Sequence, residues 1–289
     1  MMPAIITLAP NDSLQQAFDH ASPGSTVRLL PGVYRQKIVI RTPGLQIEGS
    51  GLEKTTLVWD DYANKVHADG KEYNTFRTYT LAVCADGISM RNLSIVNDAL
   101  DPKEKGQEVA LSVLGDRFFM ENCRLSSTQD TLFAGPLPAD LIERYDGFLT
   151  DELRAPGPCH QRYANCLIEG SVDFIFGCAD ALFDQCEIRS VYDGRQIGYV
   201  AAPAHALAQS EGLHFRSCRF TCEPAVLPRS VYLARPWRDY GIAVFENCQY
   251  GPHIAPEGFD KWNDTNRDQT ARFYESPHVH GRVAWARAL

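Results

Sequence analysis

Two aspartates that share the same spacing from a cysteine could supply an acid and a nucleophile. Asp130 lies seven residues after Cys123, and Asp173 lies seven residues after Cys166. If these cysteines occupy equivalent positions in neighbouring coils of a repeat, the two carboxyl groups lie one coil apart. Two carboxylates at that separation do not easily both stay charged. The aspartates are therefore candidates for a catalytic pair of one acid and one nucleophile.

The spacing alone leaves a structural alternative open. Asp193 also lies seven residues after a cysteine, Cys186, so an aspartate at this position could instead cap a turn of the repeat. What distinguishes Asp130 and Asp173 is the sequence on either side of each, Q-D-T-L for the first and G-S-V-D-F-I-F-G for the second. We therefore interpret these two as the functional aspartates.

The elements that must position this pair follow from an internal repeat. A four-residue motif recurs in the sequence. It consists of one small or polar residue, one apolar residue, any residue and another apolar residue, and it starts at Asn92, Asn122, Asn165, Gln185, Ser217 and Asn247. The intervals of 30, 43, 20, 32 and 30 residues are too variable for a propeller. They suit a solenoid whose strands stack while its loops vary in length. The repeat predicts an all-β fold, a right-handed parallel β-helix.

Five of the nine cysteines occupy the second position of this motif. Stacked coils place equivalent residues above one another at about 4.8 Å, so the cysteines at 123, 166, 186, 218 and 248 are expected to form a reduced internal ladder, deepest at Cys166 and Cys186. There is no C-x-x-C pair, and Cys218 and Cys222 have no histidine partner at zinc spacing. We expect neither a metal site nor a cofactor.

The N-terminal segment differs from the rest of the chain. Residues 13–16 have the S-x-x-Q form of a capping box and lead into an amphipathic pattern, which predicts a short helix. After it come short β-branched and apolar runs at residues 26–30, 37–40 and 45–48, each followed by Gly or Pro. We predict one domain over residues 1–289.

Composition excludes several classes of function. The net charge of −8 and the absence of a basic run argue against nucleic acid as a partner. No apolar stretch is long enough to span a membrane, and residues 4–8 are too short for a signal-peptide core. On this basis we expect a cytoplasmic protein with free thiols. The sequence contains no G-x-S-x-G elbow, which disfavours a serine hydrolase.

Three motifs together give a resemblance to a known family. These are Q-D-T-L at residues 129–132, G-S-V-D-F-I-F-G at 170–177 and L-A-R-P-W at 233–237. In these segments the chain resembles the pectin methylesterase (pectinesterase) family. The resemblance extends in order from P-G-V-Y at 31–34 through G-Q-E-V-A-L at 106–111 and Y-V-A-A-P at 199–203 to the region of Tyr240, and so covers nearly the whole chain.

The resemblance implies roles for five residues. Asp173 would be the nucleophile that attacks an ester carbonyl, and Asp130 would be the general acid and then the base. Gln107 and Gln129 would form the oxyanion hole, and Arg235 would orient Asp173. Each role is chemically reasonable, because amide N–H groups stabilise an oxyanion and a guanidinium binds a carboxylate through charge-assisted bonds. On the same reasoning we expect Arg235 to hold the pKa of Asp173 below its ordinary value and Asp130 to lie above it.

Three further residues are predicted to bind substrate: Trp237, which could stack on a sugar ring or the ester methyl, Phe176 and Tyr199. The alternation of residues 174–176 predicts that one face of that strand points into the core and the other toward the groove. The loop at 135–158 is expected to rim the groove.

The resulting hypothesis is a monomeric pectinesterase that acts on methylated galacturonan or oligogalacturonides and releases methanol. Three alternatives stay open. The enzyme could hydrolyse another acyl ester or a thioester, the chain could be a non-catalytic pectin-binding β-helix, or the same fold could carry a polysaccharide lyase or glycosidase, since fold does not fix function.

Overall fold

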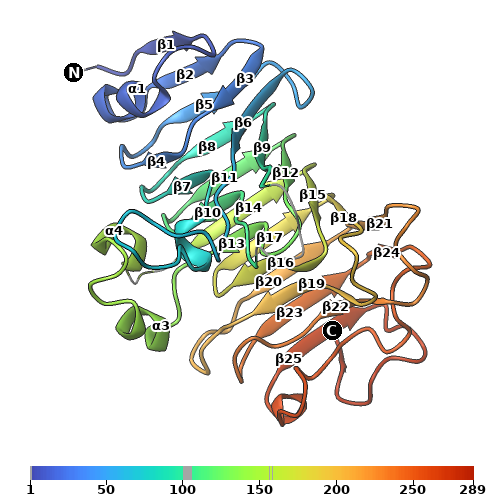
Figure 1. Cartoon of the computed structure of the whole chain (residues 1–289). Helices are drawn as coiled ribbons and strands as arrows, with labels where there is room; N and C mark the ends of the chain where they lie inside the picture. Colours follow the sequence, from blue (N-terminus) through green and yellow to red (C-terminus); the bar gives the residue numbers. More distant parts are fainter. Residues whose placement is uncertain (1, 100–105, 156, 158) are drawn as a thin grey trace.

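Three parallel sheets wind around one elongated core in a right-handed parallel β-helix (Figure 1). The structure is a computed structural model that describes residues 2–99, 106–155, 157 and 159–289. Every strand pairing between neighbouring coils is parallel, and a typical coil contributes one strand to each sheet in turn. The fold class predicted from the repeat is confirmed.

Sheet 1 has eleven strands, which run along the whole length of the helix. They are β1 (Ile5–Leu8), β2 (Thr26–Leu29), β5 (Gln46–Glu48), β8 (Ser89–Arg91), β11 (Phe118–Glu121), β14 (His160–Ala164), β17 (Asp180–Asp184), β20 (Leu213–Arg216), β23 (Ile242–Glu246), β25 (Arg272–Ser276) and β26 (Arg287–Ala288).

Sheet 2 has eight strands and sheet 3 has seven. Sheet 2 contains β3 (Gly32–Arg35), β6 (Thr55–Trp59), β9 (Ser94–Asn97), β12 (Arg124–Ser126), β15 (Leu167–Gly170), β18 (Glu187–Ser190), β21 (Arg219–Cys222) and β24 (Gln249–Tyr250). Sheet 3 contains β4 (Ile38–Ile40), β7 (Leu81–Val83), β10 (Leu111–Val113), β13 (Leu132–Ala134), β16 (Val172–Gly177), β19 (Gly198–Pro203) and β22 (Val231–Ala234).

The repeated four-residue motif forms the sharp turn between sheet 1 and sheet 2. Its first residue adopts a left-handed backbone at all six positions, with φ between 49° and 58°. Asparagine tolerates this conformation better than most residues, which explains its frequency there. Asn122 also donates from Nδ2 to Oδ1 of Asn92 in the coil before it, at 2.6 Å. The polar residue therefore turns the chain, and the apolar residue after it points into the core.

The cysteine ladder is confirmed. The residues that follow the five cysteines pair in register from β12 to β24, so the cysteines are vertical neighbours. All are free thiols, four are buried, and Cys248 at the end is half-buried. The expectation that Cys166 and Cys186 are the deepest is wrong, because Cys123 is at least as deeply buried: Leu93 occupies the same position in the preceding coil and covers it.

Sheet 1 carries an aromatic stack that the sequence analysis did not identify. Tyr163, Phe183, Phe215 and Phe245 occupy paired positions, with ring centroids 4.7 to 4.9 Å apart and nearly parallel planes. Offset stacking of this kind adds to the free energy of burial. It holds the central coils, which carry the site, in fixed register.

Helix α1 (Leu14–His20) lies at the N-terminal end of the solenoid, as predicted (Figure 1). The Ser13 hydroxyl accepts from the backbone N–H of Gln16 at 3.3 Å, and Leu14 and Phe18 are buried. These apolar residues cover the first coils of the core. None of the helices in the described ranges is long and apolar enough to cross a bilayer.

The segment at 135–158, predicted as a loop, contains two short helices, α3 (Ala139–Arg144) and α4 (Asp151–Arg154). Its residues 156 and 158 lie outside the described ranges. Together with the turn of 3₁₀ helix η1 (Thr75–Arg77), the two helices project from the face of sheet 3 (Figure 1). Sheet 3 is therefore the face on which the solenoid carries additional structure.

The predicted alternation at residues 174–176 is wrong. Phe174 and Ile175 both lie in the main core, whereas Phe176 belongs to a separate apolar cluster with Phe133 and Leu141. The left-handed backbone of Asp173, with φ of 49°, is the cause, because it shifts the register of β16 against β19 and breaks the two-residue period.

Candidate active site

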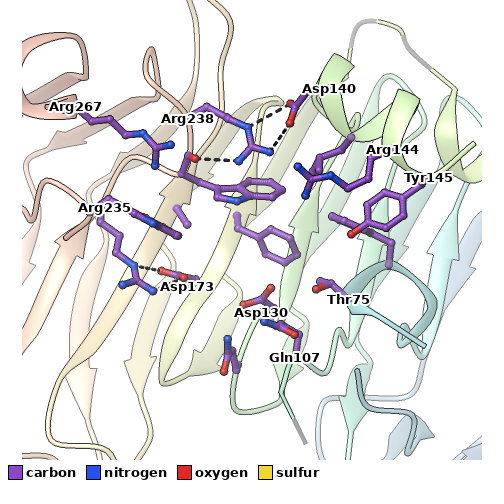
Figure 2. Close-up of a pocket in the computed structure, with 17 residues that line it drawn as sticks. Thr75, Gln107, Asp130, Asp140, Arg144, Tyr145, Asp173, Arg235, Arg238 and Arg267 are labelled. Atoms are coloured by element: carbon purple, nitrogen blue, oxygen red, sulfur yellow. Dashed lines mark hydrogen bonds and ion pairs between the residues drawn. The ribbon is translucent and has the colours of Figure 1, made fainter. Parts of the chain in front are cut away.

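A pocket of about 530 Å³ lies over the middle strands of sheet 3. Its lining brings together seven of the eight residues predicted from the sequence (Figure 2). These are Gln107, Gln129, Asp130, Asp173, Phe176, Arg235 and Trp237. They come from four of five successive coils, those of β10, β13, β16 and β22, and are up to about 130 positions apart in the sequence.

Asp130 and Asp173 are neighbours in adjacent coils. Gln129 pairs with Val172 in a parallel bridge, which places the next residue of each coil side by side. The N–H of Asp130 donates to the carbonyl of Val172 at 3.1 Å. Both aspartates have a left-handed backbone, with φ of 63° and 49°. Strained non-glycine residues of this kind cluster at functional sites.

Arg235 fixes the carboxylate of Asp173 by two parallel hydrogen bonds (Figure 2). Its Nε donates to Oδ1 at 2.8 Å and its Nη2 donates to Oδ2 at 2.6 Å. The guanidinium lies between two aromatic rings, with its central carbon 3.7 Å from the centroid of Tyr199 and 4.1 Å from that of Trp262. Both planar faces of Arg235 are thus covered, which leaves it little freedom to turn away from Asp173.

The pKa values of the two carboxyls are raised to different extents because their neighbours differ. Asp130 is 8% exposed, and burial together with the nearby charge of Asp173 raises its pKa well above the ordinary value. Asp173 is 7% exposed, and burial raises its pKa as well, while the Arg235 ion pair opposes the rise. The expectation that Asp173 lies below its ordinary pKa is therefore wrong in direction, since burial outweighs the arginine. The rise is larger for Asp130, which makes it the better suited of the two to carry a proton.

Gln129 is oriented from outside the pocket. Its Oε1 accepts from Nη2 of Arg195 at 2.7 Å, so its amide nitrogen faces Asp130, with which the side chain is hydrogen-bonded. Arg195 in turn forms an ion pair with Asp193 at 3.4 Å. The N–H of Glu108 donates to the carbonyl of Gln129, which brings Gln107 to the same wall. The two amide side chains therefore flank the carboxyl pair.

Aromatic side chains form the apolar part of the pocket. Phe176 and Trp237 meet edge to face, with centroids 5.8 Å apart, and Phe76 contacts Phe133 at 5.0 Å and Trp237 at 6.5 Å. Trp237 is half-buried and lines the pocket, as does Phe176. A flat apolar surface beside carboxyl and amide groups suits a sugar ring bearing a small ester.

Tyr199 is placed differently from its prediction as a substrate contact. Tyr199 is not among the described residues that line the pocket. One face of its ring lies against Arg235, and the ring stacks on Tyr232 at 5.5 Å in the next coil. The geometry therefore gives Tyr199 a role in positioning Arg235.

Several pocket residues were missed from the sequence. Trp262 and Arg267 come from the segment after β24, and Arg238 follows Trp237 directly. The sequence shows only that a tryptophan and two arginines lie outside the repeat. It does not show that the loops that carry them fold over the pocket. Helix α3 contributes Asp140, Leu141 and Arg144, and Tyr145 follows it. The described residues show no cluster of His, Cys, Asp or Glu able to hold a metal ion.

This geometry can support nucleophilic acyl chemistry. An ionised carboxylate held by a fixed guanidinium is available to attack, and a protonated carboxyl beside it can donate a proton. Amide groups at the same wall can stabilise developing negative charge.

The amino-acid sequence is similar to those of known proteins. A sequence model of the family "Pectinesterase" matches residues 7–136 and 153–287. The chain is 30% identical to Pectinesterase QRT1 of Arabidopsis thaliana over 279 residues, which cover 90% of this chain but 64% of that protein. It is also 30% identical to Pectinesterase 31 of the same plant over 294 residues, 96% of this chain and 83% of that one. The chain thus spans less than two thirds of the first relative.

Solved structures give the same fold. Pectin methylesterase PemA from Erwinia chrysanthemi superposes with a TM-score of 0.81 at 24% identity, over 99% of this chain and 92% of that one. Pectin methylesterase from carrot gives 0.81 at 23% identity, over 98% and 88%. Because the family model matches most of the sequence and the folds superpose throughout, the chain belongs to the pectinesterase family.

Proposed function

We propose that this protein hydrolyses the methyl esters of galacturonate units in pectin or pectic oligosaccharides and releases methanol. The observation that carries the proposal is the unequal carboxyl pair, in which Arg235 holds Asp173 by two hydrogen bonds while burial and the charge of Asp173 raise the pKa of Asp130 well above its ordinary value. Family membership supports the choice of ester and sugar. The aromatic surface of Trp237 and Phe176 supports binding of a sugar ring.

In the first half of the reaction, a carboxylate oxygen of Asp173 attacks the carbonyl carbon of the methyl ester. The resulting oxyanion accepts hydrogen bonds from the side-chain amides of Gln107 and Gln129. When the C–O bond to the methoxy group breaks, Asp130 donates its proton and methanol leaves. The product is a mixed anhydride between Asp173 and the galacturonate carboxyl group.

In the second half, Asp130 is ionised and acts as the base. It takes a proton from a water molecule, whose oxygen attacks the galacturonate carbonyl carbon of the anhydride. The bond to Asp173 breaks, and Asp130 again holds a proton. The galacturonic acid unit leaves with the second proton of the water and loses it to solvent. Arg235 binds the carboxylate of Asp173 before the anhydride forms and again after it breaks. It therefore stabilises the ionised form of Asp173 at both ends of the reaction.

The test is incubation of the purified protein with methylated di-, tri- and hexagalacturonates. We expect methanol in proportion to carboxylate released and no new reducing ends. New reducing ends would indicate a lyase or glycosidase, and binding without turnover would indicate a non-catalytic β-helix. Hydrolysis of other acyl esters in preference to these substrates would identify a different esterase. The cytoplasmic location and the monomeric state stay predictions, to be checked by cell fractionation and by sedimentation.

A further inference from the structure

Gln129 is connected to a loop that lies outside the pocket. Residues 191–197 join β18 to β19, two coils after the segment that carries Gln129. Arg195, in this loop, donates from Nη2 to Oε1 of Gln129 at 2.7 Å. Arg195 is not among the described residues that line the pocket. Its contact with the site is therefore made through the amide of Gln129.

The contact with Arg195 decides which end of the Gln129 amide faces the pocket. A guanidinium has only N–H donors, so the amide atom that it binds is the carbonyl oxygen. The amide nitrogen then points to the other side, toward Asp130 and the pocket. An oxyanion needs N–H donors, and a carbonyl oxygen in the same place would repel it. Only one of the two orientations of the amide therefore supports the proposed reaction.

Without Arg195, the acid of the reaction would favour the wrong orientation. In the proposed reaction Asp130 carries the proton that methanol takes, and a protonated carboxyl donates an O–H. The carbonyl oxygen of a neighbouring amide accepts such a bond. The amide of Gln129 would then turn its oxygen toward Asp130 and its N–H groups toward the loop. The charge-assisted hydrogen bond from Arg195 to this oxygen opposes the rotation.

Arg195 is held in turn by Asp193. Oδ1 of Asp193 accepts from the backbone N–H of Arg195 at 3.0 Å, and Oδ2 lies 3.4 Å from Nη1 of the guanidinium. Oδ2 also accepts from the hydroxyl of Ser171 at 2.5 Å. The side chain of Asp193 is 2% exposed, whereas that of Arg195 is 40% exposed. Asp193, which has the same spacing from a cysteine as the carboxyl pair, thus caps its own loop and fixes the base of Arg195.

We propose that Arg195 is a positioning residue that fixes the amide of Gln129 with its N–H groups toward the reacting ester. The inference rests on the proposed function, and it adds a residue that lies outside the three sequence motifs. The orientation of the amide matters when the oxyanion forms in the transition state, and much less when the uncharged ester binds. Loss of Arg195 therefore lowers kcat and leaves KM nearly unchanged.

A double-mutant cycle in the intact enzyme tests this coupling, with methanol release from a methylated trigalacturonate as the readout. We expect Gln129→Ala to lower kcat by about a hundredfold and Arg195→Gln by about tenfold, with KM changed by less than about threefold in both. In the Gln129→Ala background, Arg195→Gln should cost less than about twofold, because the amide that Arg195 fixes is gone. Arg195→Lys keeps a charged donor and should recover part of the loss.

Rates are compared at the pH optimum of each variant, since the charge of Arg195 also lowers the pKa of Asp130 and Asp173. Asp173 and Arg235 are the other charged groups that act on Asp130, and Arg235 and Asp260 act on Asp173. This comparison separates the orientation of the amide from the effect of a lost positive charge.

Arg219→Gln is the matched control, since Arg219 is an exposed arginine of β21 that pairs with Glu187 and does not line the pocket. It should keep the kcat of the wild type. The unfolding temperature of each variant shows whether its fold is intact. Unchanged kcat in Arg195→Gln, or equal losses from this change with and without Gln129, would overturn the positioning role. If the wild type released no methanol from any substrate, the proposed function itself would fail, and this result is distinct from the other two.

Discussion

Asp130 and Asp173 occupy equivalent places in adjacent coils, and their different chemistry comes from what each one touches. Arg235 bonds to Asp173 alone, while Asp130 has the amide of Gln129 and the negative charge of its neighbour. The sequence motifs predicted this set of groups. They did not predict the balance of burial against charge, because the extent of burial depends on the loops that close over the site.

The rate of the reaction should therefore fall at high pH. Asp130 must be protonated to act as the acid, and its pKa is raised well above the ordinary value by burial and by Asp173. As pH rises through that pKa, the proton is lost and kcat should decrease, while ionisation of Asp173 sets the lower limb. A pH–rate profile on a methylated trigalacturonate checks this. A rate that keeps rising into the alkaline range would contradict the assignment of Asp130 as acid.

Replacing Arg235 with lysine should reduce turnover more than binding. Lysine keeps the charge but loses the planar fork and its stacking between Tyr199 and Trp262. We expect kcat to fall by at least about tenfold with KM changed by less than about threefold. Arg267→Lys is a control for the loss of a guanidinium elsewhere in the lining, because Arg267 bonds to Asp239 and not to Asp173. Unchanged turnover in Arg235→Lys would show that Arg235 does not orient Asp173.

At the scale of elements, the repeat was readable because a tight turn restricts which residues fit. The left-handed turn residue and the buried residue after it recur in every coil from β9 to β24. The segment at 135–158 has no such repeat, so helices α3 and α4 and the contact of α3 with the pocket could not be predicted. The same holds for the stack on sheet 1, where Tyr163 and Phe183 are set by register and not by a motif.

The ladder predicts the reactivity of the thiols. Burial raises the pKa of Cys123 to about 12, and the hydrogen bond with Cys186 together with burial raises the pKa of Cys218 to about 12, so little thiolate forms at either at neutral pH. In native protein we expect an aromatic disulfide reagent to label the half-buried Cys222 first and the ladder only after unfolding. Cys222→Ser should remove the rapid phase. Rapid labelling of Cys186 in the folded protein would show that the register of the coils is wrong.

At the scale of the whole molecule, stability should depend on pH through a buried histidine. His205 accepts from the N–H of Ile242 at Nδ1 and donates from Nε2 to the carbonyl of Ala179, so it is held neutral between two coils. Burial lowers its pKa to about 4. The unfolded chain therefore binds the proton more readily, and stability is lost as pH falls from about 6.5 toward 4, by up to about 3 kcal/mol.

Thermal unfolding from pH 7 to pH 4 measures this dependence. His205→Gln keeps a donor and an acceptor but cannot gain the proton, so its unfolding temperature should fall less steeply than that of the wild type over this range. His278→Gln, at an exposed position near the C-terminus, should follow the wild type. If the slopes of wild type and His205→Gln coincide, His205 is not a source of acid sensitivity.

The proposed covalent mechanism depends on Asp173 as the nucleophile of a methylesterase. The most direct test is methanol release from a methylated trigalacturonate by Asp173→Asn, with circular dichroism to confirm the fold. Asp19→Asn is a control for the same chemical change elsewhere, since Asp19 is an exposed residue of α1 and does not line the pocket. We expect Asp173→Asn to lose at least about a thousandfold in turnover, while Asp19→Asn keeps its activity. Substantial methanol release by folded Asp173→Asn would contradict the covalent mechanism.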